Sequence, residues 1–493
     1  MGAALKIPSA LPAGRTFLVL LLASAGISGL VGPGFSAFAT TPDHRDDPVP
    51  VALFGATVVD GTGAPPLQDA VVVLAQGRIE CVGPRGHCPV PDGIPTLDVT
   101  GHWITPGLVD AHAHFSLSGW VDSRPDLLDL RAEYPYASTI ARLRRSPELF
   151  FQSYLCSGVT AVFDLGGFPW TWELRDRARV SGAAPTIAAA GPFLSTRDAW
   201  LNLPAERQFL HMSDRDAVRS GADYLISSGA DAVKVLHLGG EGPSGRAGRE
   251  REYLELAGRW ARSGGIPLIV HATELELARE ALEAGASILA HSVEDQVVDD
   301  AFVDLLRRRG GFYTPTLWVH EAAAQLRERH WVEDELDEIC VDPGTLERLR
   351  STSVRPGRDS DDQLADARMD DEGRRRVMEE NLLRIHAAGV PLLVGSDAGN
   401  PLVPHGPGIH RELGALQAAG IPPEDLLRAA TLNGARAMGM AEIMGSVEAG
   451  KVADLLVLRG DPLEDVANLN RSLRMVVRGG YVLGRDDLAF TAP

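Results

Sequence analysis

The chain has 493 residues and a formal net charge of −19, with 47 Lys and Arg against 66 Asp and Glu, and 45% of its residues are hydrophobic. This length and composition are those of a globular protein with a large buried core. Because proteins bind phosphate backbones through an excess of Lys and Arg, the acidic balance excludes nucleic-acid binding as the main function.

Residues 1–39 have the organisation of a secretory signal peptide. Lys6 and Arg15 precede an apolar run over residues 17–31, and an Ala-Phe-Ala segment that ends at Ala39 fits an A-x-A cleavage site. Ser and Gly interrupt the run, which favours a cleaved signal over a membrane span; a retained anchor is the alternative. We expect export, to a periplasm or to the outside of the cell, and no membrane-spanning segment after cleavage.

Residues 40–50 form a polar linker, and the two flanks that follow it and close the chain are β-rich. Short apolar runs separated by Gly, Pro and Asp extend from residue 51 to about 99, and the same pattern returns near the C-terminus. We therefore expect a small β-sandwich domain formed by residues 51–103 and 440–490, with one large insertion between its halves.

The four cysteines, Cys81, Cys88, Cys156 and Cys340, are too few for a disulfide scaffold, and none has metal-binding or redox spacing. Cys81 and Cys88 flank a Gly-Pro-Arg-Gly turn, so a hairpin would bring them together. An exported protein permits such a bond. The sequence leaves open whether this pair is bonded or whether the cysteines are buried thiols.

Within residues 104–439, apolar runs of strand length alternate with helix-like stretches, such as residues 251–265, in which apolar residues recur at helical spacing before Gly. The eight runs are residues 104–110, 159–166, 185–192, 231–238, 266–272, 287–292, 311–317 and 390–397. This alternation predicts an α/β fold, a (β/α)8 TIM barrel, whose buried strands are apolar throughout. An open doubly wound sheet explains the alternation equally well until the polar residues are placed.

The gap between the seventh and eighth runs, residues 318–389, is longer than one helix needs and rich in charge. We expect extra helices there. They are either a mobile lid over the mouth of the barrel or a solvated insertion without a catalytic role.

Metal-binding types of side chain stand at the ends of these runs. His112 and His114 follow the first run, and in a strand residues i and i+2 project from one face. The other positions are Lys234 in the fourth run, His271 at the end of the fifth, His291 at the end of the sixth and Asp397 at the end of the eighth. Taken alone, His271 or His291 is more often a hydrogen-bonded core histidine, Asp397 a helix cap and Lys234 half of an internal ion pair. In a barrel, however, the carboxyl ends of all strands surround one mouth. Their shared placement therefore predicts a metal site.

The chain resembles the amidohydrolase superfamily, in the branch of imidazolonepropionase-like and Xaa-Pro dipeptidase-like proteins. The resemblance rests on the motifs PGLVDAHAHF, GADAVKVLH, LIVHA, LAHS, VGSDAG, AATLNGARAMG and GSVEAGKVADLLVLRGDPL, and it extends from about residue 51 to 485. It implies a binuclear centre with three sets of ligands: His112, His114 and Asp397 on one metal, His271 and His291 on the other, and a carboxylated Lys234 bridging both.

The lysine also has a chemical rationale. A protonated amine beside two dications is disfavoured, whereas a neutral amine can add carbon dioxide and become an anionic carbamate. Mononuclear deaminases of the superfamily generally lack this lysine, so Lys234 favours two metals and hydrolysis over deamination. Zinc is the expected ion, since imidazole and carboxylate suit it; manganese, cobalt and iron are alternatives.

We expect a metal-dependent hydrolase in which a metal-bridging hydroxide attacks an amide carbonyl carbon, the C–N bond then breaks, and Asp397 carries the hydroxide's proton to the leaving amine. The expected substrate is a small molecule or short peptide, with dipeptides and N-acyl amino acids first. Ring opening of a cyclic amide is the alternative; a non-catalytic binding protein would be indicated by a missing ligand, and none is missing. His237, His320 and His405 are candidates for substrate contact. The sequence leaves the substrate, the metal and the oligomeric state open, and a homo-oligomer is compatible with it.

Overall fold

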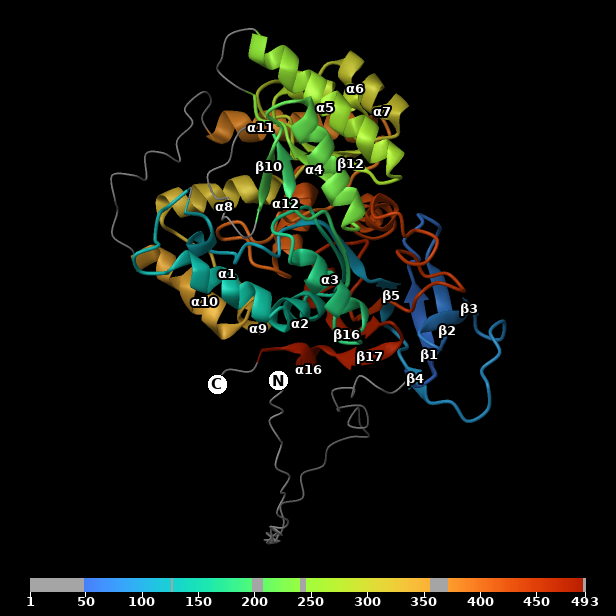
Figure 1. Cartoon of the computed structure of the whole chain (residues 1–493). Coiled ribbons are helices and arrows are strands. Elements are labelled where there is room, and N and C mark those ends of the chain that lie inside the picture. The colour runs from blue at the N-terminus through green and yellow to red at the C-terminus, as the bar shows by residue number, and fades with distance from the viewer. Residues whose placement is uncertain (1–47, 126, 197–206, 240–244, 355–370, 491–493) are drawn as a thin grey trace, which may run out of the picture. The chain divides into compact units, whose positions relative to one another are not determined.

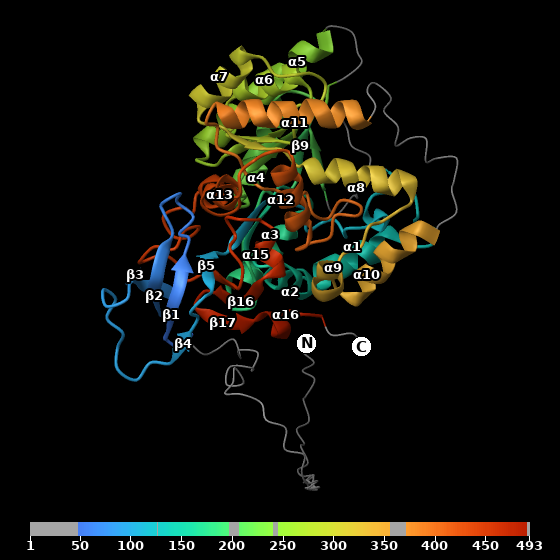
Figure 2. The same cartoon turned by 180° about the vertical axis from the view of Figure 1, so that it is seen from behind.

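The computed structural model describes residues 48–125, 127–196, 207–239, 245–354 and 371–490 (Figures 1 and 2). The predicted signal peptide and most of the predicted linker lie outside these ranges. No helix within them is long and apolar enough to cross a bilayer.

The two flanks of the chain form one large sheet, in which the blue N-terminal and red C-terminal strands of Figures 1 and 2 meet. Its order is β17-β16-β15-β5-β1-β2-β3, and β4 pairs with β1. The strands are β1 (Val51–Val58), β2 (Leu67–Ala75), β3 (Arg78–Pro84), β4 (Thr96–Asp98), β5 (Trp103–Pro106), β15 (Leu455–Leu458), β16 (Leu473–Arg478) and β17 (Tyr481–Gly484). The antiparallel pairing of β5 with β15 joins the two ends of the chain.

The predicted sandwich differs in one respect: these eight strands belong to one hydrogen-bonded sheet, not to two stacked sheets. Both faces are nevertheless apolar, since Val72 packs in one hydrophobic cluster and Val71 and Val73 in another. The loop after β3 contributes Cys88 to the second cluster, and a disulfide joins it to Cys81 on β3. The loop that carries Cys88 thus packs on the face of the sheet that a second sheet would cover in a sandwich. The sequence left open whether Cys81 and Cys88 are bonded, and the structure has the bond.

The first apolar run of the insertion, predicted as one strand over residues 104–110, is divided at Gly107. β5 ends at Pro106 in the large sheet, and β6 (Leu108–Ala113) pairs in parallel with β7. A Cβ at Gly107 would lie 2.2 Å from Thr160 Oγ1, so only glycine fits where the chain crosses between the sheets. The predicted domain boundary at 103/104 therefore moves to about residue 107.

The parallel strands form two sheets, β6-β7-β8 and β10-β9-β11-β12-β13-β14. They are β7 (Val159–Asp164), β8 (Thr186–Ala189), β9 (Phe193–Ser195), β10 (Phe209–His211), β11 (Val233–Leu236), β12 (Leu268–His271), β13 (Ile288–Ala290) and β14 (Phe312–Thr314). The short strands β9 and β10 were not predicted. The eighth run, residues 390–397, forms one isolated bridge, Leu392 with Tyr313, and the next residue, Ala398, forms another with Ala113. Its backbone still joins the two sheets, because Leu393 N donates to Tyr313 O and Asp397 N donates to His112 O.

Helices follow the strands as the sequence pattern predicts. They are α3 (Thr171–Arg179), α4 (Arg215–Ser227), α5 (Gly245–Ser263), α6 (Leu275–Ala284), α7 (Asp300–Arg309), α11 (Asp371–Ala387), α12 (Gly408–Ala418), α13 (Pro423–Arg428) and α14 (Gly434–Ala437), with a π-helical turn at Ala429–Asn433. Asp214 and Asp299 cap α4 and α7 through their carboxylates, and Gly285 and Gly310 end α6 and α7 in the left-handed conformation. Two short helices, α15 (Asn468–Arg471) and α16 (Arg485–Leu488), accompany the C-terminal strands.

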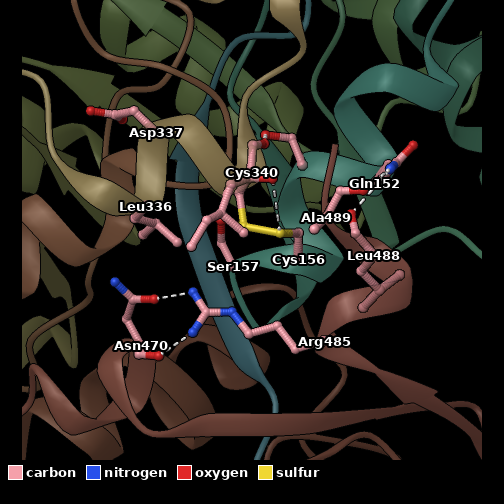
Figure 3. The surroundings of a disulfide bond; sticks show 12 residues. Gln152, Cys156, Ser157, Leu336, Asp337, Cys340, Asn470, Arg485, Leu488 and Ala489 are labelled. Carbon is pink, nitrogen blue, oxygen red and sulfur yellow. Dashed lines mark hydrogen bonds between the residues drawn. A yellow bond between two sulfur atoms is a disulfide. The ribbon is translucent and has the colours of Figure 1, made fainter. Parts of the chain in front are cut away.

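The insertion between β14 and residue 390 is helical, as predicted, in its described part: α8 (Leu317–Glu328), α9 (Glu335–Cys340), α10 (Pro343–Arg350), the 3-10 turn Ser351–Val354 and α11. It is fastened to the pair α1 (Tyr136–Arg145) and α2 (Glu148–Cys156) by a disulfide between Cys156 and Cys340 (Figure 3), a pair that sequence spacing did not indicate. Trp120 Nε1, near the 3-10 turn Val121–Ser123, donates to Thr352 Oγ1. The lid stays a prediction, and its charge-rich centre, residues 355–370, lies outside the described residues.

Candidate metal centre

Two of the predicted ligands stand on β6 and converge with a third from the eighth run. His112 Nε2 and His114 Nε2 lie 3.2 Å apart, and Asp397 Oδ1 lies 3.4 and 3.1 Å from them. All three side chains are buried, and their ligand atoms are close enough to hold one ion. The i, i+2 spacing therefore places both imidazoles on one face of the strand, as the sequence predicts.

The other two predicted imidazoles continue this row. The His291 ring centroid lies 4.9 Å from that of His112, and His271 lies 4.4 Å from His291. They come from the carboxyl ends of β13 and β12, two neighbouring parallel strands. Four histidines from distant parts of the sequence thus form one contiguous group.

Lys234, on β11, is the sixth member of the group. Its side chain is 1% exposed, and Nζ has no hydrogen-bond partner among the described residues. Burial lowers the pKa of the amine to about 7, against the attraction of Asp397, and its charge acts on His112 and His271. The structure therefore brings all six predicted ligands to one place.

The protonation states fit a divalent cation. Burial lowers the pKa of His271 to about 3 and holds those of His112 and His291 well below their ordinary value, so these imidazoles are neutral and have lone pairs to offer. Burial raises the pKa of Asp397, but His112 and His114 outweigh it and hold that pKa well below its usual range. Asp397 Oδ1 and His112 Nδ1, like the Lys234 amine, lack a hydrogen-bond partner among the described groups. Buried polar atoms without a hydrogen-bond partner are the kind of atom that can serve as metal ligands.

Hydrogen bonds outside the group orient the rings. His114 Nδ1 donates to Gly166 O at 2.8 Å, and His291 Nδ1 lies 2.8 Å from Thr316 Oγ1. Each bond engages Nδ1 and leaves Nε2 for the centre. His291, Thr316 and Asp397 have positive φ angles of 75°, 49° and 57°, a conformation that non-glycine residues rarely adopt and that clusters at functional sites.

Asp110 holds the two halves of the site together, a role that the sequence analysis missed. Its carboxylate accepts from His112 N and, across the sheet, from Ser396 N and Ser396 Oγ. It therefore ties β6 to the segment that carries Asp397. The signal was present, because Asp110 is two residues before His112 and so shares its face of the strand.

Asp164 was also missed. It ends β7, burial raises its pKa to about 7, and its Oδ2 has no partner among the described residues. The rule that identified the other positions, a polar residue at the carboxyl end of a predicted strand, applies to it as well.

The three candidates for substrate contact have different surroundings. His405 stacks on Phe115, its Nδ1 is 3.0 Å from the Tyr154 hydroxyl, and its Nε2 donates to Leu117 O. Both ring nitrogens are thus already used within the protein, so this geometry does not favour a substrate contact, and the predicted contact of His405 stays a prediction. His237 is buried and donates from Nε2 to Glu280 on α6.

His320 is the candidate beside open space. It lies in the first turns of α8, its side chain is 29% exposed, and it lines a cavity of about 650 Å³. The predicted contacts of His237 and His320 with substrate stay predictions.

Comparison with known proteins agrees with this geometry. The model of the amidohydrolase family matches residues 103–484. The imidazolonepropionase of Pseudomonas fluorescens (strain Pf0-1) is 27% identical over 431 residues, which cover 81% of this chain and 90% of that protein. A Xaa-Pro dipeptidase structure with bound methionine in the active site has a TM-score of 0.67 at 20% identity, covering 88% of this chain and 100% of the other. Molinate hydrolase has a TM-score of 0.67 at 22% identity, covering 91% and 99%.

The structural neighbours imply a TIM barrel with an additional domain, formed respectively by the parallel strands and the large sheet. The family match confirms the predicted resemblance, and members of this family generally use a divalent metal. The candidate site has the ligands for one. The chain therefore belongs to the amidohydrolase family and is a hydrolase of carbon–nitrogen bonds.

Proposed function

We propose that this protein is an exported binuclear amidohydrolase that cleaves an amide bond in a small molecule or short peptide, with dipeptides and N-acyl amino acids as the first candidates. The observation that supports this proposal is Lys234, a buried amine without a hydrogen-bond partner among the described residues, next to neutral imidazoles and a carboxylate. Family membership supports hydrolysis, and the lysine supports a second metal.

Lysine at this position is informative because the chain otherwise avoids it. Of 47 Lys and Arg, only Lys6, Lys234 and Lys451 are lysine. Arginine stays protonated in proteins, whereas a buried lysine loses its proton readily. With its pKa lowered to about 7 by burial, the Lys234 amine is partly neutral near neutral pH and can add carbon dioxide to form an anionic carbamate. A guanidinium would not undergo this change.

Two divalent metals, with zinc first, fit this set of donors. The residues that would hold them are His112, His114 and Asp397 for one metal, His271 and His291 for the other, and carboxylated Lys234 for both. When bound, the metals supply Lewis acidity that activates water and polarises the substrate carbonyl.

Asp397 is the residue that we propose to move protons. Its carboxylate is held ionised among His112 and His114, so it can accept a proton from the attacking water. It then passes that proton to the leaving nitrogen. Amide hydrolysis needs the second transfer, because an amine anion is a poor leaving group.

The test uses the two lysines that remain if the signal peptide is removed. The protein is loaded with zinc in ¹³C-bicarbonate, the carbamate signal is recorded by ¹³C NMR, and hydrolysis of dipeptides and N-acyl amino acids is measured. We expect Lys234→Arg to lose both the signal and activity, at least 1,000-fold as an order of magnitude. Lys451→Arg is the matched control, since Lys451 pairs with Glu448 and is not one of the candidate ligands. Full activity in Lys234→Arg would refute the binuclear proposal.

Ring opening of a cyclic amide is the second candidate. The imidazolonepropionase of P. fluorescens, similar over 81% of this chain, favours it. Both reactions need the same attack on a carbonyl, so the substrate has to decide. Turnover of five- and six-membered lactams or imidazolones, with no turnover of linear amides by the same zinc-loaded sample, would select this alternative.

Export is part of the proposal and rests on the signal-like residues 1–39. Two disulfides, Cys81–Cys88 and Cys156–Cys340, are compatible with an oxidising compartment. N-terminal sequencing of the protein from fractionated cells tests it. A mature terminus at residue 40 in the exported fraction is expected, and an intact chain in the cytosol with reduced cysteines would refute export.

A further inference from the structure

A cavity of about 650 Å³ lies between α8, α11 and α12, in the described part of the chain. Its volume is that of a pocket for a small organic molecule. None of the six predicted metal ligands lines it. It is therefore distinct from the metal centre, although the two are neighbours.

Two connections place the cavity against the centre. Leu317, a lining residue, directly follows Thr316, whose hydroxyl bonds with His291. On the other side, Glu294 lies three residues after His291, and its Oε2 is 3.6 Å from His320 Nδ1 and 3.7 Å from Arg374 Nη1, both on lining residues. The cavity wall is thus connected to the candidate centre through Thr316 on one side and Glu294 on the other.

The walls favour a neutral, apolar occupant. Apolar lining comes from Leu317, Trp318, Ala324, Met378 and Ala415. The charged lining residues are each paired, as Arg374 with Glu294, Arg375 with Glu321 and Glu379, Arg411 with Asp337, Asp371 with Arg327 and Glu372 with Arg376. Because each of these charges already has a partner within the chain, the apolar part of the wall is the part left to contact a ligand.

Gly414 supports a function for this space. It lies inside α12, where glycine weakens a helix relative to alanine. A Cβ there would meet nothing within 4 Å, so packing does not require glycine at this position. The residue lines the cavity, and its missing side chain enlarges it.

We propose that this cavity is a specificity pocket that takes a bulky apolar group of the amide substrate, such as an aromatic ring. The inference rests on the proposed amide hydrolysis and adds the substrate class. The first turns of α8, which begins one residue after Thr316, supply His320 and Trp318 to the wall of this pocket.

The experiment compares N-acetylglycine with N-phenylacetylglycine and N-acetylphenylalanine, which carry a ring on one or the other side of the amide. For the zinc-loaded wild type we expect kcat/KM for at least one aromatic substrate to exceed that for N-acetylglycine by about 30-fold or more. Gly414→Phe fills the cavity and should lower this preference, the ratio of kcat/KM for the aromatic substrate to kcat/KM for N-acetylglycine, at least tenfold.

Two controls isolate the effect of filling. Gly414→Ala adds only the Cβ. Gly248→Phe adds the same ring on α5, where a Cβ also meets nothing within 4 Å. Circular dichroism and metal content confirm that each variant is folded and loaded. Equal kcat/KM for all three substrates in the wild type, which needs no variant, would overturn the pocket, as would a Gly414→Phe variant that keeps the aromatic preference.

Failure of the proposed function gives a different result. If the zinc-loaded wild type hydrolyses none of these amides, binding of N-phenylacetylglycine is measured by calorimetry. Tenfold weaker binding to Gly414→Phe than to Gly414→Ala would support the pocket without the activity. No binding to the wild type, or equal binding to both variants, would overturn it.

Discussion

The disulfide between Cys156 and Cys340 should contribute more to stability than the one between Cys81 and Cys88. The first joins residues 184 positions apart and the second residues 7 apart. In the chain-entropy model, closing these loops in the unfolded state is worth about 5 and about 2 kcal/mol at 25 °C. Replacing both cysteines by alanine should therefore cost about 3 kcal/mol more for the long loop than for the short one.

Packing acts in the same direction. Cys156 on α2 and Cys340 on α9 are completely buried (Figure 3). The Ser153 hydroxyl donates to Cys340 O. Cys81, on the edge strand β3, and Cys88, in the loop that follows, are less enclosed, since Cys81 is only partly buried. Truncation to alanine thus leaves a larger void at the long-range bond.

The assay is urea unfolding of the two double-alanine variants and the wild type under non-reducing conditions, followed by far-UV circular dichroism. The free energy of unfolding should fall in the order wild type, Cys81→Ala/Cys88→Ala, Cys156→Ala/Cys340→Ala. Equal destabilisation by the two pairs would refute the loop-length argument. A wild type that is unchanged on reduction would refute both bonds.

Three further predictions concern Glu412, on α12, and two residues that contact candidate ligands, Thr316 and Asp110. Burial raises the pKa of Glu412 from 4.5 to about 8, so the free energy of unfolding should fall as pH rises between these values. Glu412→Gln should remove this fall. Urea titrations between pH 4 and 8 should then show a gain for the variant, relative to the wild type, of about 5 kcal/mol. Thr316→Val, which loses the bond to His291, should weaken zinc binding about 10- to 100-fold in competition with a chelating dye, and Thr316→Ser should restore it. Asp110→Ala, which unties β6 from Ser396, should likewise reduce bound zinc, and unchanged metal content would contradict its role.

The shared location of the candidate metal ligands was predictable because it follows from the position of each residue on its own strand. Parallel strands all have their carboxyl ends on one side, so a polar residue that ends each apolar run is placed without knowledge of the pairing. His271 and His291 illustrate this: they directly follow the apolar residues 268–270 and 288–290, and the structure puts their rings 4.4 Å apart.

Features that depend on contacts between distant residues were not predictable in this way. His405 resembles a catalytic loop histidine in sequence, but its partners, the Tyr154 hydroxyl and Leu117 O, are more than 250 positions away. Cys156 finds Cys340 for a similar reason. The break at Gly107 follows from a single close approach to Thr160, which no local pattern records.

The eighth run shows how a predicted site residue can lie beside the other candidates although the strand predicted to carry it is not formed. Residues 390–397 are apolar like a strand, yet their bridge to Tyr313 is an isolated one. Asp397 has a φ of 57°, and leaving the extended conformation there aims its carboxylate at His112 and His114. Such a conformation costs about 1–3 kcal/mol for a non-glycine residue. The bonds from Ser396 to Asp110 anchor the segment against this cost, so the geometry that ends the strand is the geometry that completes the ligand set.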